Sequence, residues 1–250
     1  MTVLFIFPHP DDETIFAGGI IARHVTSGDK VIWLCVSYGE KCRISRKYSP
    51  CLFYFTYFLL RYFPFPIFLQ RVAIQWLSLF RKPSQQAIKS RRYEAEEVAQ
   101  IYGISKLHFL EIEDIKFKKN SAEIRGKIRE YIKLYQPCLI YTYHPNGMTS
   151  HPDHKHLTES VIRVAGSLPA DKKPKILGAT IPTVIIKKYK LPLLGTSEAE
   201  IYSKIELNSQ ELDKKIQAIN AYTSQKYLWE LFLKKYPELL GKEYFIKLLD

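Results

Sequence analysis

Short apolar runs of strand length alternate with amphipathic stretches of helix length through the first half of the chain, and this order restricts the fold more than any other feature. The runs that predict strands are Val3–Phe7, Val31–Ser37, Leu107–Leu110 and Cys138–Tyr143, and the stretches that predict helices are Thr14–Thr26, Ser84–Tyr102 and Ser121–Tyr135. Strands that alternate with helices form a mainly parallel sheet with right-handed crossovers. Such sheets bind ligands beyond the carboxyl ends of their strands, so the sequence predicts an α/β fold with a site at that edge.

The length and cysteine content predict one domain in a reducing compartment. A chain of 250 residues, 46% of them hydrophobic, can build one complete core, so we expect a single domain over residues 1–250. Cys35, Cys42, Cys51 and Cys138 contain no CxxC pair. Cys35 and Cys138 lie in apolar runs, which predicts buried free thiols. The N-terminus lacks the charge and apolar pattern of a signal peptide, so a cytoplasmic protein is expected.

The net charge of +12 and the isoelectric point near 9.4 favour anionic partners. Nucleic acid, acidic lipid and a phosphorylated substrate are all negatively charged, and the net charge of the chain does not choose among them. The chain has no zinc-finger spacing and no RNA-binding sheet motif, which disfavours nucleic acid as a partner. The sequence does not predict an oligomeric state.

One histidine and three carboxylates directly follow the first predicted strand, in the order His9, Asp11, Asp12 and Glu13. Charged groups this close repel one another and lose hydration when buried, so they need a cation, several hydrogen-bond donors or open water. A divalent metal ion meets that need with the fewest groups. The alternative is a helix N-terminus that favours negative charge through its dipole and needs no metal.

A second group of possible ligands, His151 and His154, lies in the loop after the fourth predicted strand. A catalytic zinc site uses three imidazole or carboxylate ligands and leaves one position for water. His9, Asp12 and one of the two later histidines would complete such a site. If a helix begins near His151, both histidines lie on one face, so one can bind metal while the other faces the substrate. The HxxH spacing alone is weak evidence, and its alternative is a structural or surface role.

Two motifs, Pro8–Glu13 (PHPDDE) and His151–His154 (HPDH), resemble in type and order those of the PIG-L/LmbE-like deacetylases. The resemblance extends to the Arg91–Gly103 segment, to Asp114 and to Ser224-Gln225. Members of this family are metal-dependent enzymes that hydrolyse N-acetyl groups of glucosamine-containing lipids, thiol precursors and related amides. The resemblance implies a Rossmann-like α/β fold, in agreement with the order of predicted elements.

The resemblance also implies a metal site made by His9, Asp12 and His154, holding Zn²⁺ or another divalent ion such as Fe²⁺. Asp11 is then the general base, because one aspartate binds the ion while its neighbour accepts a proton from metal-bound water, whose pKa falls to about 7. That water attacks the amide carbonyl. His151, in its protonated form, assists the developing oxyanion and donates to the leaving amine.

Four further residues receive supporting roles from the resemblance. Asp153 is expected to orient His151 or to raise its pKa. Glu13 is expected to contact the substrate or the metal ligands, and Arg91 and Asp114 are expected to contact the sugar or its anionic substituent. For Arg91, which lies in a basic run, the alternative is a solvated helix face.

An aromatic-rich insertion at about residues 43–83 is the largest departure from the family pattern. Arg61, Pro64 and Pro66 interrupt its central part, residues 51–80, so a membrane span of about 20 apolar residues is not expected. One interpretation is a cap over the mouth of the active site. The other is an interfacial patch that contacts an anionic membrane peripherally at its cytoplasmic face.

A smaller departure lies before HPDH, where some family members have a tyrosine and this chain has Met148-Thr149-Ser150. Tyr141 and Tyr143 are the candidates to replace its assistance at the oxyanion. The predicted function is a metal-dependent N-deacetylase of an N-acetylglucosamine-type conjugate, which includes lipid-linked amino sugars. The alternatives are a non-catalytic lipid- or glycan-binding protein on the same scaffold and a hydrolase of another amide or of a phosphoester.

Overall fold

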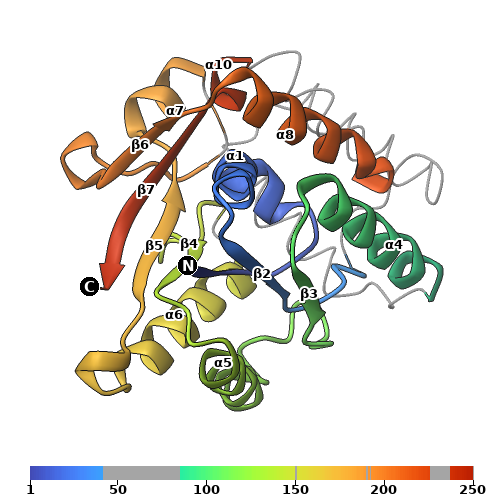
Figure 1. The fold of residues 1–250 in the computed structure, drawn as a ribbon, viewed down its shortest axis with the longest axis vertical. Coiled ribbons are helices and arrows are strands. Elements are labelled where there is room, and N and C mark those ends of the chain that lie inside the picture. The colour runs from blue at the N-terminus through green and yellow to red at the C-terminus, as the bar shows by residue number, and fades with distance from the viewer. Residues whose placement is uncertain (42–84, 150, 190, 192, 226–236, 250) are drawn as a thin grey trace, which may run out of the picture.

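Seven strands form one sheet in the order β3-β2-β1-β4-β5-β7-β6 in the computed structural model (Figure 1). The strands are β1 (Thr2–Phe7), β2 (Lys30–Cys35), β3 (Lys106–Phe109), β4 (Leu139–Tyr143), β5 (Lys175–Thr180), β6 (Ser203–Glu206) and β7 (Lys242–Leu249). The first five pair in parallel, whereas β7 runs antiparallel to both β5 and β6. The structure describes residues 1–41, 85–149, 151–189, 191, 193–225 and 237–249.

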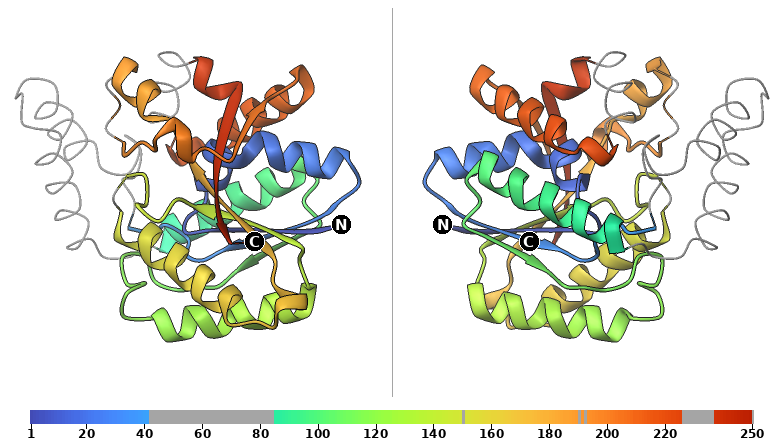
Figure 2. Two further views of the ribbon diagram at one scale, coloured as in Figure 1. Left: turned by 90° about the vertical axis from the view of Figure 1, so that its left-hand side faces the viewer. Right: turned by 90° about the vertical axis from the view of Figure 1, so that its right-hand side faces the viewer.

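Helices cover both faces of this sheet, as the side views show (Figure 2). One layer contains α1 (Asp12–Thr26), α4 (Gln85–Tyr102) and α8 (Ser209–Ala221), and the other contains α5 (Ser121–Tyr135) and α6 (Pro152–Gly166). Shorter elements are α7 (Thr183–Tyr189), α10 (Pro237–Leu240) and the 3-10 turns Ala170–Lys172, Glu198–Glu200 and Thr223–Gln225. Alternate side chains of β1 enter the two cores, Phe5 and Phe7 on the α1 side and Leu4 and Ile6 on the α6 side.

The chain changes direction across the sheet at β1, and this topology creates the site. From β1 it continues outward through β2 to β3, and then returns to the other side of β1 through β4 to β5. The carboxyl ends of β1 and β4 therefore lie beside each other at a topological switch point, where open α/β sheets bind ligands. The loops that begin after Phe7 and after Tyr143 both emerge there.

The predicted α/β fold with a mainly parallel sheet is confirmed, and the predicted strands and helices lie within two residues of the observed ones. Cys35 is a buried free thiol as predicted. Cys138 is also a free thiol, but its predicted burial is wrong, because it precedes β4 at the amino-terminal end of the strand and is exposed. Cys42, Cys51 and the insertion at about 43–83, with its two interpretations, lie outside the described residues. Among the helices that the structure describes, none has the length and hydropathy of a membrane span.

Candidate metal centre

The loop after β1 turns sharply into α1 and presents its acidic residues there. Asp11 is the N-cap residue of α1 and has φ 93° and ψ −32°, a conformation that residues with a Cβ rarely adopt. Asp12 and Glu13 follow in the first turn of the helix, and both are buried. Strain of this kind persists only where neighbouring groups hold the backbone in place.

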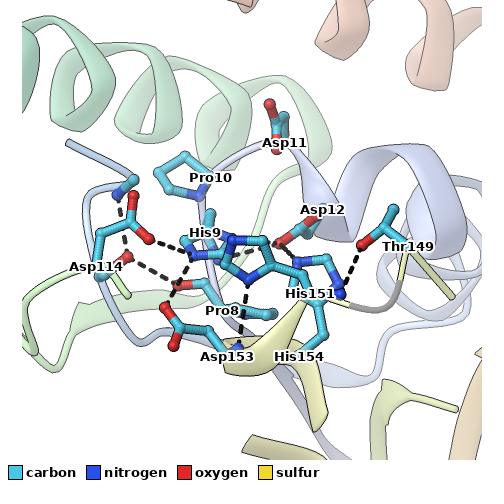
Figure 3. A network of polar contacts seen from close by, with 12 residues as sticks. Pro8, His9, Pro10, Asp11, Asp12, Asp114, Thr149, His151, Asp153 and His154 are labelled. Atoms are coloured by element: carbon cyan, nitrogen blue, oxygen red, sulfur yellow. Dashed lines mark hydrogen bonds and ion pairs between the residues drawn. The ribbon is translucent and has the colours of Figure 1, made fainter. Parts of the chain in front are cut away.

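Three donor groups from two strand ends converge beside this turn (Figure 3). His9, Asp12 and His154 each offer one ligand atom, and these atoms lie within 4.8 Å of one another. Asp12 Oδ2 lies 3.1 Å from His9 Nδ1 and 3.5 Å from His154 Nε2. Atoms that share one tetrahedral Zn²⁺ at about 2.0–2.1 Å are about 3.3 Å apart, so the spacing and the nitrogen and oxygen donors fit such an ion.

Each of the three groups also has a partner that fixes its orientation, as ligands of metal ions commonly do. The Tyr143 hydroxyl donates to Asp12 Oδ1 at 2.6 Å, which leaves Oδ2 toward the imidazoles. His154 Nδ1 lies 3.2 Å from the carbonyl oxygen of Gly147, so it carries the proton and Nε2 has the free lone pair. Gly147 has φ 71°, and a Cβ there would lie only 3.2 Å from the His151 carbonyl oxygen, which explains the glycine.

The remaining nitrogen of His9 faces two carboxylates. His9 Nε2 lies 3.2 Å from Asp114 Oδ1 and 3.7 Å from Asp153 Oδ2. Neither His9 Nε2 nor Asp114 Oδ1 reaches good hydrogen-bond geometry with a partner, although both atoms are buried. Burial lowers the pKa of His9, but the carboxylates of Asp114, Asp12 and Asp153 outweigh it and raise that pKa well above its ordinary value. A cation bound at Nδ1 would take the place of this extra proton.

Asp11 lies apart from the imidazoles (Figure 3). It contacts Arg91 instead. Arg91 Nη1 donates to Asp11 Oδ2 at 3.3 Å, and Nη2 donates to the Pro10 carbonyl oxygen at 2.6 Å. Burial raises the pKa of Asp11 to about 7, while the Arg91 guanidinium opposes that rise. A carboxylate with a pKa near neutrality is suited to accept a proton in catalysis. Arg91 itself is only 2% exposed, so the interpretation as a solvated helix face is wrong for it, although it holds for the neighbouring Arg92.

Glu13 and Asp114 are also buried rather than placed on an open surface. Glu13 has no exposed area, and its carboxylate accepts hydrogen bonds from Asp11 N, Thr14 Oγ1 and Tyr222 Oη. Asp114 accepts a hydrogen bond from the Lys41 backbone and faces His9. These contacts favour a role in holding the site. The sequence-based expectation was contact with the sugar or its substituent for Arg91 and Asp114, and contact with the substrate or the metal ligands for Glu13.

His151 begins α6 as its N-cap residue, with Pro152 in the first turn. His151 Nδ1 accepts a hydrogen bond from the Asp153 backbone N–H at 3.3 Å. The Asp153 carboxylate accepts from Ile115 N and Phe117 N and faces His9. Burial lowers the pKa of His151 to about 4, which opposes the expected protonated form. The charge of Asp153 raises this pKa, in the predicted direction, but does not outweigh burial. His9, His151 and Asp153 form a second group with ligand atoms within 4.8 Å.

The sequence model of the family described as "PIG-L: GlcNAc-PI de-N-acetylase" matches residues 4–165. The chain belongs to the PIG-L family. It is 27% identical over 230 residues to a protein of Bacillus cereus named "Probable N-acetyl-alpha-D-glucosaminyl L-malate deacetylase 2", covering 89% of this chain and 83% of that protein. The matched region contains both motifs that carry the site.

Two solved structures share the fold of this PIG-L chain. The N,N'-diacetylchitobiose deacetylase of Pyrococcus horikoshii has a TM-score of 0.64 at 18% identity, with 99% of this chain and 83% of that chain covered. The 4-carboxy-2-hydroxymuconate hydratase of Pseudomonas putida has a TM-score of 0.66 at 17% identity, with 100% and 96% covered. These likenesses show the fold alone, and since one of the two proteins is a hydratase, the fold does not specify the reaction.

Two residues that support the site in this PIG-L chain were not predicted in these roles. Tyr143 was considered only as a donor to an oxyanion, but its hydroxyl is buried against Asp12. Tyr141, the other tyrosine considered as a donor to an oxyanion, does not support the site. Its hydroxyl contacts His24 Nε2 at 3.2 Å, away from the metal ligands. Tyr222 contacts Glu13 across 209 positions of sequence. The position of Tyr143 at the end of a strand could have indicated its contact with the metal ligands. Nothing in the sequence around Tyr222 indicates its contact with Glu13.

Proposed function

We propose that the protein is a metal-dependent hydrolase that removes the N-acetyl group from an N-acetylglucosamine-type conjugate. The observation that carries the proposal is the convergence of His9, Asp12 and His154, with ligand atoms within 4.8 Å, next to the strained Asp11. The donor set suits Zn²⁺ and is also compatible with Fe²⁺. The family match and the named activities of the relatives support deacetylation as the reaction.

In this proposal a divalent ion held by His9, Asp12 and His154 would make a water molecule more acidic and polarise the amide carbonyl. Asp11 accepts the proton of the attacking water and returns it to the amine nitrogen as the C–N bond breaks, and its raised pKa suits both tasks. Arg91 holds the Asp11 carboxylate on one side, so the group is oriented before the substrate arrives.

His151 supplies a hydrogen-bond donor to the carbonyl oxygen in the same scheme. Its Nδ1 accepts from the Asp153 backbone, so the neutral ring carries its proton on Nε2. A neutral imidazole can therefore donate to the developing oxyanion without the positive charge that the sequence suggested. The Asp153 and Asp114 carboxylates lie near Nε2 of His9, the ring nitrogen that faces away from Asp12, and orient that ring. Substrate contacts of Glu13, Arg91 and Asp114 stay predictions.

A free-amine assay tests this proposal. The full chain is purified, loaded with Zn²⁺ or Fe²⁺, and incubated with N-acetylglucosamine conjugates that are neutral, anionic or lipid-linked, together with other acetamides. We expect amine release from at least one amino-sugar conjugate, none from the chelator-treated protein, and only slow residual release from Asp11→Asn. Metal-loaded protein that binds a conjugate without releasing amine would instead support the non-catalytic alternative. Release from other acetamides only would point to a different amide substrate.

We also propose, from sequence composition, that residues 51–80 contact an anionic membrane peripherally. This segment combines many aromatic residues with basic ones, and basic residues near an anionic surface contribute about 1 kcal/mol each. Binding to phosphatidylserine vesicles should weaken with salt and be lost when a short polar linker replaces the segment. Unchanged binding after that replacement would leave the cap as the remaining interpretation.

A further inference from the structure

We propose that Tyr222 is a positioning residue for Asp11 and acts through Glu13. The inference rests on the proposed function, because it assigns a support to the group that accepts the proton. Tyr222 follows the last residue of α8, and its side chain is fully buried. It lies far from Asp11 in sequence, and no motif connects the two.

The first step of the argument is that the backbone of Asp11 needs a partner. A residue other than glycine is strained at φ 93°, so contacts must stabilise the turn. The Asp11 N–H donates to Glu13 Oε2 at 3.1 Å. Its carbonyl oxygen accepts from Ile15 N at 3.1 Å, which begins the helix. Glu13 therefore holds the strained residue by its backbone.

The second step is that Glu13 is itself held by Tyr222. The Tyr222 hydroxyl donates to Glu13 Oε1 at 2.6 Å, and the Thr14 hydroxyl donates to the same oxygen at 2.6 Å. Thr14 belongs to the same turn of α1 and moves with it. Tyr222 is the C-cap residue of α8, a different helix of the same layer, so its contact ties this turn of α1 to the end of α8.

The third step is that the segment after Tyr222 also contacts α4, the helix that carries Arg91. Arg91 is the other side chain that holds Asp11. Glu94 accepts hydrogen bonds from Thr223 Oγ1 at 2.8 Å, Ser224 N at 2.7 Å and Ser224 Oγ at 2.7 Å. Glu94 lies one turn after Arg91 on α4. The segment Tyr222–Ser224 thus joins the helix that carries Arg91 to the turn that carries Asp11. This assigns a use to a C-terminal segment that the metal ligands do not explain.

The test is Tyr222→Phe in the full chain loaded with Zn²⁺. Loss of the hydroxyl frees Glu13 and lets Asp11 shift, so kcat should fall about tenfold or more. KM should change by less than about twofold and the metal content should stay at the wild-type level, because the hydroxyl contacts none of the proposed metal ligands. The matched control is Tyr135→Phe, which removes a hydroxyl bound to His108 on the opposite layer and should keep wild-type kcat.

A double-mutant cycle separates positioning from a general structural effect. In the Asp11→Asn background, Tyr222→Phe should cause little further loss of residual turnover, because the group it positions no longer accepts a proton. Wild-type kcat in Tyr222→Phe, or the same fold loss in both backgrounds, overturns the proposal. If Tyr222→Phe fails to fold, Glu13→Gln takes its place in the cycle. It should lower kcat in the wild-type background and cause little further loss in the Asp11→Asn background. An inactive wild-type protein would refute the proposed function instead, which distinguishes the two failures.

Discussion

Two buried groups of charged side chains contact α1, and they differ in whether their charges are balanced. In the middle of the helix, Lys215 Nζ lies 2.7 Å from Glu243 Oε1, and both side chains are 1% exposed. Glu243 also accepts hydrogen bonds from Gly19 N and Ile20 N at 2.7 and 2.9 Å. This pair contains its own cation and enough donors.

At the start of the same helix the balance is different. The imidazole of His9 lies close to three carboxylates, those of Asp12, Asp114 and Asp153. Buried carboxylates without a matching cation are costly, and that cost falls when a cation is bound. The comparison teaches that burial of charge does not by itself mark a functional site. An excess of buried carboxylates over cations among the described residues, here three carboxylates around one imidazole, is the better indication.

The largest expected effect is on turnover, and it comes from Asp11, the residue beside the unbalanced group. Asp11→Asn should lower kcat by about 10²–10⁴-fold, because the amide cannot accept a proton from water. The metal content should stay near the wild-type value, since Asp11 is not among the three converging ligands. Steady-state kinetics together with metal analysis checks this. Wild-type turnover in the variant would remove Asp11 from the role of base.

The next effect concerns the balanced pair and appears in stability instead of activity. Lys215→Met should lower the free energy of unfolding by about 3–5 kcal/mol, because it leaves the buried Glu243 without its cation. The turnover per folded, metal-loaded molecule should not change. Urea denaturation measures the free energy of unfolding, and steady-state kinetics of the folded fraction measures the turnover. A variant as stable as the wild type would show that the pair is not essential to the core.

A smaller effect is expected for the groups that orient His9. Asp114→Asn should weaken Zn²⁺ binding by about 10–100-fold, as for other groups that orient a metal ligand. Competition with a chromogenic chelator measures the dissociation constant. Binding as tight as in the wild type would mean that Asp114 does not support the ligand.

The smallest expected effect is at an exposed ion pair, which serves as a reference for the buried groups. Arg92 and Glu96 form an ion pair on α4 with side chains 56% and 47% exposed. Arg92→Ala should change the free energy of unfolding by less than about 0.5 kcal/mol, because exposed pairs are screened by water. It should leave metal binding and kcat unchanged. A loss comparable to that of Lys215→Met would undermine the contrast between buried and exposed charge.

The sequence predicted the parallel part of the sheet well, because buried parallel strands such as β1 and β2 are continuous apolar runs. It did not predict the antiparallel edge. Strand β6 has four residues that alternate between half-buried and exposed, and β7 pairs with strands distant in sequence. Such pairings depend on the tertiary structure and leave a weak local pattern.

The types of residue at the site were also predicted, but not the directions of their side chains. The motifs identified His9, Asp12 and His154, and the switch of strand order explains why they meet. The sequence could not show that Glu13 and Arg91 point into the protein, because burial there depends on α4 and α8 packing against α1. The contact between Tyr222 and Glu13 depends on the same packing.

The central claim is that the group at the ends of β1 and β4 is completed by one divalent cation. Equilibrium titration of the metal-free protein with Zn²⁺, in competition with a chromogenic chelator, tests it directly. The account predicts one tightly bound ion per wild-type chain and binding at least about 100-fold weaker in His154→Ala. Near-stoichiometric, equally tight binding in His154→Ala, or no binding by the wild-type chain, would contradict it.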